Sequence, residues 1–305
     1  MNAIPGVRRT RYRSTFASAG VLLLVAVSAW ATTPVELAKL IAEDSASNDF
    51  FGFSIALSDN TAVIGALRDD DNGVDSGSVH VFTRFGTKWS QQTKLTPADG
   101  GAGDEFGGKV ALDGDIAVIG ARLDDDKGVD SGSAYVFTRS GTGWSHQAKL
   151  IASDGAAGDE FGYSVAISGD TAVIGAPRDD DKRDDSGSAY VFTRSGHTWS
   201  QQAKLVAQDG GAGDVFGISV AISGDTLVIG ADLADEKGSN SGAAYVFSRS
   251  GNTWSQQVKL TADDGAAGDL FGIRVTLSGD TAVIGAARDD DKGDESGAAY
   301  VFTRT

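Results

Sequence analysis

Hydrophobic and polar side chains alternate from Phe161 to Ser168, and this alternation predicts a β-strand with one buried face. The segment Ser168–Thr171 carries Gly and Asp, which tolerate the positive φ angles of tight turns, and it predicts a hairpin. Residues 172–176 are apolar and rich in β-branched side chains, so they predict a second strand buried on both faces. After an acidic loop, residues 188–194 and 199–206 predict a third and a fourth strand.

This four-strand pattern is one unit of a repeat. A Phe-Gly pair opens each copy, at Phe51, Phe106, Phe161, Phe216 and Phe271, so that successive copies are 55 residues apart. The Ile-Gly-Ala segment of the second strand keeps the same register from Ile64 to Ile284. A fixed period of this length is typical of a stacked or circular array whose units cannot bury a core alone. Four antiparallel strands in each period predict the blades of a β-propeller.

The Phe-Gly pairs and the Ile-Gly-Ala segments, one of which continues as Gly175-Ala176-Pro177, resemble FG-GAP repeats. These repeats form the propeller of integrin α-subunits and occur in many bacterial secreted proteins. The resemblance covers residues 35–304 and implies an all-β propeller fold. It also implies, in many members, a calcium loop between the first and second strands. Here that connection is only Ser-Gly-Asp-Thr or its equivalent, which is too short to wrap an ion, so the family's calcium site does not transfer.

The Phe-Gly glycine is expected to let backbones approach closely where the innermost strands crowd together. Residues 34–42 align with the fourth strand of the other copies, because Lys39-Leu40 lies 55 residues before Lys94-Leu95. The last copy reaches Thr305 just after its third strand.

We therefore expect five four-stranded antiparallel blades, closed by an N-terminal strand that pairs in the last blade and removes its open edge. The alternative is an incomplete larger ring, since related propellers often have seven blades. Such a ring would expose apolar faces and require association with another chain.

Residues 1–31 predict a secretory signal peptide. They carry four arginines at positions 8, 9, 11 and 13, continue with an apolar run over residues 19–30, and end in the small-x-small segment Ala29-Trp30-Ala31. A retained N-terminal anchor and, through Arg8-Arg9, a twin-arginine signal are the alternatives. We expect residues 32–305 to form a single propeller domain that is secreted, periplasmic or on the cell surface, with no transmembrane segment.

Charge and cysteine content limit the classes of ligand and partner that the chain can bind. The chain has no cysteine, so disulfides and thiolate metal ligands are excluded. Its formal net charge is −16, and loss of the four leader arginines makes it more negative by four. This charge argues against nucleic acid and anionic membranes as partners, and it suits cations or basic partners.

In an antiparallel meander, the loop between the second and third strands and the loop between consecutive blades emerge on the same face. Both loops are acidic, and carboxylates spaced within one turn can supply the oxygen ligands of calcium. The candidate metal ligands are Asp69, Asp71, Asp75, Asp124, Asp126, Asp130, Asp179, Asp181, Asp185, Asp289, Asp291 and Glu295. The fourth copy has lost this set, because Ala234, Glu236 and Asn240 occupy its positions.

The alternative to calcium is a solvated acidic loop in which aspartates stabilise turns. The loops between blades keep one aspartate at Asp44, Asp99, Asp154, Asp209 and Asp264. They keep a second at Asp49, Asp104, Asp159, Asp214 and Asp269, two residues before each Phe. These residues make the face acidic whether or not an ion is bound.

An active site would require an unrepeated set of catalytic groups, and the three histidines (His80, His146 and His197) occupy unrelated positions. We therefore expect a binding or adhesion module, not an enzyme. The leading hypothesis is a secreted or cell-surface module that engages a protein or glycan through the acidic loop face, with calcium as its cofactor. The alternatives are a non-catalytic scaffold of an envelope assembly and, last, a propeller glycoside hydrolase built on two carboxylates.

Overall fold

The computed structural model describes residues 36–304, and the predicted signal peptide of residues 1–31 lies outside them. The described residues form 19 β-strands and no helix, which confirms the all-β prediction. None of them forms a helix that could cross a membrane. Residues from Ala38 onward form the propeller unit.

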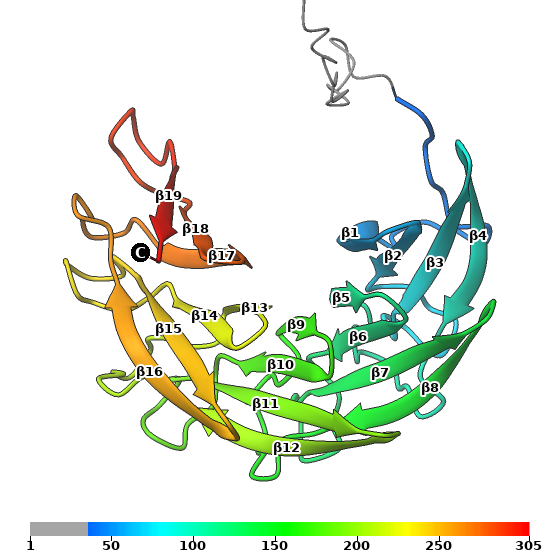
Figure 1. Cartoon of the computed structure of the whole chain (residues 1–305), viewed down its shortest axis with the longest axis horizontal. Coiled ribbons are helices and arrows are strands. Elements are labelled where there is room, and N and C mark those ends of the chain that lie inside the picture. The colour runs from blue at the N-terminus through cyan, green and yellow to red at the C-terminus, as the bar shows by residue number, and fades with distance from the viewer. Residues whose placement is uncertain (1–35, 305) are drawn as a thin grey trace, which may run out of the picture. The chain divides into compact units, whose positions relative to one another are not determined.

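The strands form five antiparallel sheets, which are the blades (Figure 1). The first blade contains β1 (Phe51–Ser58), β2 (Thr61–Ala66), β3 (Ser78–Phe85) and β4 (Lys88–Leu95). The second contains β5 (Lys109–Asp113), β6 (Ile116–Ala121), β7 (Ser133–Ser140) and β8 (Gly143–Leu150). The third contains β9 (Ser164–Ser168), β10 (Thr171–Ala176), β11 (Ser188–Ser195) and β12 (Thr198–Leu205).

The fourth blade contains β13 (Ser219–Ser223), β14 (Thr226–Ala231), β15 (Ala243–Ser250) and β16 (Thr253–Leu260). The fifth contains three strands, β17 (Phe271–Ser278), β18 (Thr281–Ala286) and β19 (Ala298–Thr303). In each blade the strands follow one another in chain order, as the meander predicted. The five-bladed propeller fold is therefore confirmed.

Local structure follows the sequence pattern with two differences. Gly169 adopts a φ of 55° in the hairpin turn between β9 and β10, and all residues of β10 are buried, as predicted. The first strand of the third blade begins at Ser164, not at Phe161, because Phe161 forms a bridge with Gly132 of the preceding blade. The fourth strand contains a bulge at Gln202, which interrupts its predicted alternation.

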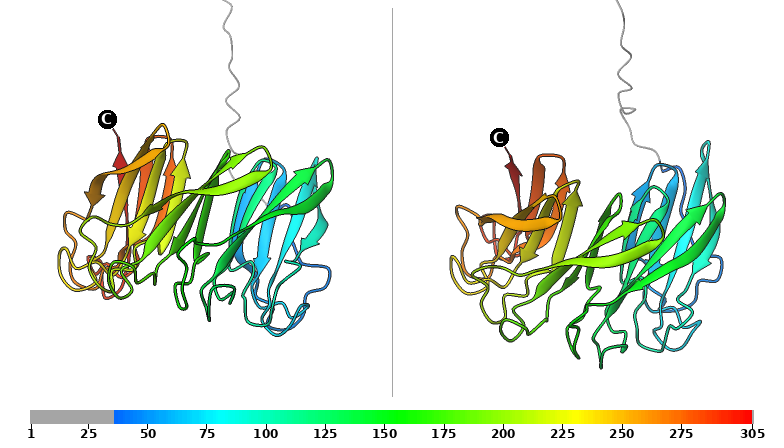
Figure 2. Two further views of the ribbon diagram at one scale, coloured as in Figure 1. Left: turned by 90° about the horizontal axis from the view of Figure 1, so that it is seen from below. Right: turned by 60° about the horizontal axis from the view of Figure 1, so that its bottom comes forward.

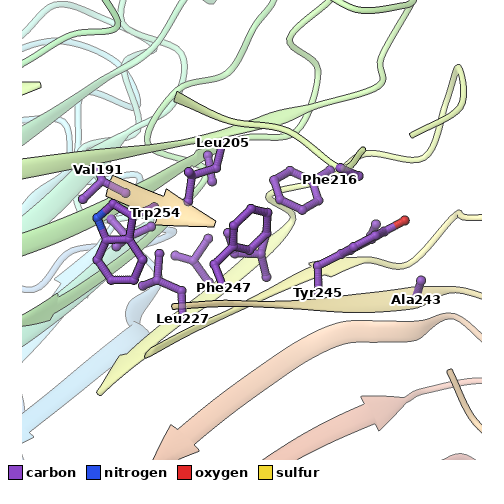
Figure 3. Packing of buried hydrophobic residues seen from close by; sticks show 14 of the residues in the cluster. Val191, Leu205, Phe216, Leu227, Ala243, Tyr245, Phe247 and Trp254 are labelled. Carbon is purple, nitrogen blue, oxygen red and sulfur yellow. The ribbon is translucent and has the colours of Figure 1, made fainter. Parts of the chain in front are cut away.

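The hydrophobic core lies between neighbouring blades. Figure 3 shows Val191 and Leu205 of the third blade beside Phe247 and Trp254 of the fourth, in one buried cluster. The phenylalanine of each interior Phe-Gly pair is buried in such an interface, and the ring of Phe216 packs edge-on against Tyr245 at 5.4 Å. The blades are therefore held together by side chains that no single blade could bury.

Glycines set how closely the blades approach. A Cβ atom on Gly120 of the Ile-Gly-Ala segment would overlap the carbonyl oxygen of Gly162, the Phe-Gly glycine of the next blade. The same overlap would occur for the pairs Gly65–Gly107, Gly175–Gly217 and Gly230–Gly272. The Phe-Gly glycine therefore has the close-approach role expected from the sequence, and its partner is the second glycine of the repeat.

The structure does not show the predicted N-terminal closure. Residues 36–42 form no strand, and no strand of the described chain pairs with the outer edge of β19. Within the propeller unit, Figure 1 shows β1 and β17 at the two ends of an open arc. The four similar blade–blade packings set a curvature at which the fifth blade does not reach the first.

Replacement of Gly120 with Ala should lower the free energy of unfolding by about 3 kcal/mol, because the new Cβ forces two backbones apart. Urea denaturation followed by circular dichroism measures this change. The matched control is Gly285→Ala, where the nearest atoms to a new Cβ lie 3.8 Å away, so that stability should change little. Equal losses in the two variants would contradict this role of the glycine pair.

Candidate functional site

The long loops lie together on one side of the blades, as predicted from the meander (Figure 2). Backbone N–H groups of one inter-blade loop donate to carbonyls of the preceding blade's acidic loop. Gly158 donates to Val129 at 2.8 Å, and Glu160 donates to Asp130 at 3.1 Å. We call this acidic side, formed by the loops between the second and third strands and by the inter-blade loops, the loop face.

A lysine ammonium lies at the centre of the carboxylates in the second blade. Lys149 Nζ is 2.9 Å from Asp99 Oδ2, 2.9 Å from Asp124 Oδ2 and 2.5 Å from Asp126 Oδ2. The Tyr135 hydroxyl donates to Asp124 Oδ2 at 2.9 Å. Tyr135 and Lys149 are directly paired across β7 and β8, so the sheet register delivers both groups to the same carboxylates. We call this arrangement the carboxylate cage.

The cage recurs from blade to blade. Lys94 is bound by Asp44, Asp69 and Asp71 in the first blade. Lys204 is bound by Asp154, Asp179 and Asp181 in the third. In the fourth blade Lys259 is bound by Asp209 and Glu236 alone, because Ala234 replaces the buried aspartate.

The fifth cage differs from the others. The Tyr300 hydroxyl lies 2.9 Å from Asp264 Oδ1 and 2.6 Å from Asp289 Oδ2, and its single proton donates to one of the two carboxylates at a time. No lysine among residues 36–304 pairs with these carboxylates or with Asp291. The charges of Asp289 and Asp264 raise the pKa of Asp291, as expected where like charges lack a cation.

Hydrogen bonds to the surrounding carboxylates hold Lys149 of the second cage in its charged form. Burial lowers the pKa of Lys149, but its bonds to Asp126, Tyr135, Asp124 and Asp99 outweigh burial and raise the pKa above the usual value. Burial raises the pKa of Asp99, and the bond and charge of Lys149 more than reverse this. The side chains of Asp124 and Lys149 are only 4% and 16% exposed, so the centre of this ion-pair network is buried. The side chains of Asp99 and Asp126 form its exposed edge.

The structure brings together only some of the predicted metal ligands. Asp69 and Asp71 meet in a cage, joined by Asp44, and the Asp71 N–H also donates to Asp69 Oδ1 at 3.1 Å. The last predicted ligand of the set, Asp75, lies elsewhere with a left-handed φ of 54°, and its N–H donates to Asp70 Oδ1 at 2.8 Å. The same geometry separates Asp130, Asp185 and Glu295 from their cages.

The cage lysines are the site residues that the sequence interpretation missed. Their signal was present, because Lys94, Lys149, Lys204 and Lys259 recur with the period of the aspartates. The aspartates that precede each Phe have a separate role. Asp159, for example, accepts the N–H of Ala156 at 2.7 Å, and burial raises its pKa to about 6. These aspartates therefore stabilise the inter-blade loops.

One unrepeated cluster lies near the inner strands. Lys109, Arg122 and Arg274 line a hollow of about 210 Å³ together with Tyr163. Burial lowers the pKa of Lys109, and the charges of Arg274 and Arg122 lower it further. The residues lining this hollow provide positive charge and a phenol but no nucleophile paired with a base. The repeated loop face is therefore the stronger candidate for function.

Replacement of Ala234 with Asp should complete the fourth cage. The Tyr245 hydroxyl has no hydrogen-bond partner in the described structure, and Lys259 lies beside it, so both would gain a carboxylate. The free energy of unfolding should rise by about 1 kcal/mol, as measured by urea denaturation. In a Lys259→Met background the gain should disappear. A loss of stability in the otherwise unchanged chain would contradict the cage.

Comparison with known proteins identifies the family to which the chain belongs. The FG-GAP repeat model matches residues 34–82, 89–137, 144–192, 199–247 and 254–302. The match to residues 89–137 runs from β4 of one blade to β7 of the next, so each matched repeat is offset by one strand from a blade. A search of curated proteins found no match to the chain. Since the matched segments cover most of the sequence and recur with the same 55-residue period, the chain belongs to the FG-GAP repeat family.

Proposed function

We propose that this FG-GAP propeller is a secreted or cell-surface binding module whose loop face engages a basic protein or glycan partner. The proposal rests on one repeated observation: the middle aspartate of each acidic loop is exposed. These residues are Asp70, Asp125, Asp180, Asp235 and Asp290. FG-GAP propellers are typically non-catalytic binding modules, which supports the same conclusion.

The exposed aspartates are free to act on a partner in a way that the cage aspartates are not. In each loop the buried first aspartate position belongs to the cage, where Asp124, for example, is neutralised by Lys149. The middle aspartate uses Oδ1 to accept a loop N–H, as Asp125 does from Asp130 at 2.9 Å. The residue is exposed and lies on the loop face in every blade, so five weak contacts can add up and steer a cationic partner.

Binding of a synthetic oligolysine peptide to the immobilised chain tests this proposal, with the peptide as a model of a basic partner. Affinity should fall steeply with added salt. It should drop at least about tenfold when all five middle aspartates become Asn. Asn keeps the oxygen that accepts the loop N–H, so the loops should stay folded.

The matched control replaces turn aspartates on the opposite side of the blades, Asp115, Asp170, Asp225 and Asp280, with Asn. This variant removes nearly the same charge, and it should bind the peptide almost as the original chain does. Equal loss in the two variants would indicate attraction by net charge alone. A chain that binds no basic probe would favour the scaffold hypothesis.

Calcium binding stays a prediction, and the carboxylate cages indicate where on the loop face the ion would bind. In the first four blades a calcium ion would have to displace the lysine ammonium, since both need the same carboxylate oxygens. In the fifth blade Asp264, Asp289 and Asp291 have no such competitor in the described chain. We therefore propose that calcium acts at the fifth blade, and that lysine serves as the built-in cation of the others.

The variant Lys149→Met tests this exchange, because it removes the ammonium that lies over the Tyr135 ring and keeps an unbranched side chain. With chelator present, Tm should fall by about 5 °C as the three carboxylates lose their counter-charge. Millimolar calcium should recover part of this loss, beyond its effect on the unaltered chain, and magnesium should recover less. An identical calcium response in both proteins would contradict the proposed exchange.

A further inference from the structure

The fifth blade is an incomplete copy of the others. An apolar groove of about 370 Å³ lies between the fourth and fifth blades, lined by Val246, Val258, Leu260, Leu277 and Phe302. In the fourth blade the corresponding surface is covered by the fourth strand, where Trp254 packs over Val191 of the third blade (Figure 3). No described residue covers it in the fifth, and the outer edge of β19 is unpaired. The fifth blade therefore has an acceptor site for one strand.

The carboxylates of the fifth blade indicate that the added strand should carry a lysine. Each of the first four cages contains a lysine from the fourth strand, and the fifth has Asp264, Asp289 and Asp291 without one. The third blade pairs Tyr190 with Lys204, so a strand added to β19 would need its lysine opposite Tyr300. Lys39 is exposed and lies one period before Lys94, in a segment that the family model already includes. Residues 34–42 thus have the required charge and register.

The first blade exposes the complementary face. Phe53, Ile55 and Leu57 of β1 are 55%, 65% and 65% exposed, whereas Val110 and Leu112 at the matching positions of β5 pack against the first blade. Gly52 has no atom near its Cβ position, although the other four Phe-Gly glycines do. Gly285 at the far end also lacks its glycine partner. The two ends are thus the two halves of the interface that joins every other pair of blades.

The donor segment is already held in place by its own first blade. Leu40 packs against the cluster of Ala62, Ile64 and Phe82, Ala42 is buried, and the Glu43 N–H donates to Gln91 Oε1 at 3.0 Å. These are the contacts that a fourth strand makes with the following blade. Closure within one chain would require all four glycine-lined blade interfaces to change their packing. Insertion into a second copy requires no such change.

We infer that residues 34–42 of one copy form the missing fourth strand in the fifth blade of a second copy. Lys39 then takes the position among Asp264, Asp289 and Asp291 that calcium would occupy in a copy without a donor strand, and the donor's first blade stacks on the acceptor's fifth. The contact is head-to-tail, so that each copy offers one donor and one acceptor and chains of copies can grow. Pro34 stands where the other blades have Trp, and the Trp-to-Gln bond of other interfaces, such as Trp254 to Gln202, is lost, so the junction is weaker and reversible. This inference does not depend on the proposed function of the loop face.

Sedimentation velocity of the purified chain over about a hundred-fold range of concentration tests the inference. Mass should rise with concentration from monomer to dimer and larger species. Lys39→Glu should disable the donor strand, and Val301→Lys should disable the acceptor face. Lys39 is exposed and Val301 is 67% exposed, so both variants should fold, as circular dichroism can verify.

Each variant alone should stay monomeric, and an equimolar mixture should form dimers only, because one intact donor meets one intact acceptor. A wild-type mass that stays monomeric throughout would overturn the inference. If Lys39→Glu then lowered the Tm of that monomer, the strand would belong to the chain's own fifth blade. Oligomers that persist unchanged in both variants would also overturn it, because the assembly would use another surface.

Discussion

The structure depends on the close approach of two backbones, where the Ile-Gly-Ala glycine of one blade meets the Phe-Gly glycine of the next. Any side chain there would separate the blades and open the apolar layer between them. Side-chain hydroxyls strengthen the approach at two interfaces, where Ser54 donates to the Gly107 carbonyl at 2.6 Å and Ser164 to that of Gly217 at 2.7 Å. The spacing fixed at these points brings neighbouring loops into contact and so builds the loop face.

The carboxylate cage shows how the fold tolerates such a dense negative charge. Each complete cage places an ammonium among the carboxylates, and the sheet register supplies it without any insertion in the loop. Little extra ordering is needed to place the ammonium, because Lys149 is fixed opposite Tyr135 once β7 and β8 pair. The proposed function assigns recognition to the middle aspartates, which are exposed. Under that proposal, stability and binding use different carboxylates of the same loop.

Much of the fold could be predicted from the sequence, because the period and the strand pattern are local properties. The blades, the hairpin turns and the shared face of the two loop types follow from alternation and antiparallel connection. The cage could not be predicted, since Lys204 in an edge strand looks like a solvent-facing residue until its pairing with Tyr190 is known. Asp75 looked like a ligand by spacing, yet its left-handed backbone turns it away. Ring closure could not be predicted from the repeat pattern either, because the curvature of the blade array depends on how side-chain volumes fill each interface between blades.

The distance between the first and fifth blades is the most direct test of the claim that glycine-lined packing holds one chain open. The chain has no cysteine, so spin labels can be placed at Asn60→Cys and Asp280→Cys, in equivalent turns of the two end blades. Such turns touch in adjacent blades, as Gly279 N–H does with Ser223 Oγ at 3.2 Å, and Asp225→Cys with Asp280→Cys gives the adjacent-blade reference. With labelled chains diluted in unlabelled ones, double electron–electron resonance should give a much longer distance between the two labels on the end blades than between the two labels of the reference. Equal distances, near the sheet spacing of about 10 Å, would show a closed ring and contradict the account.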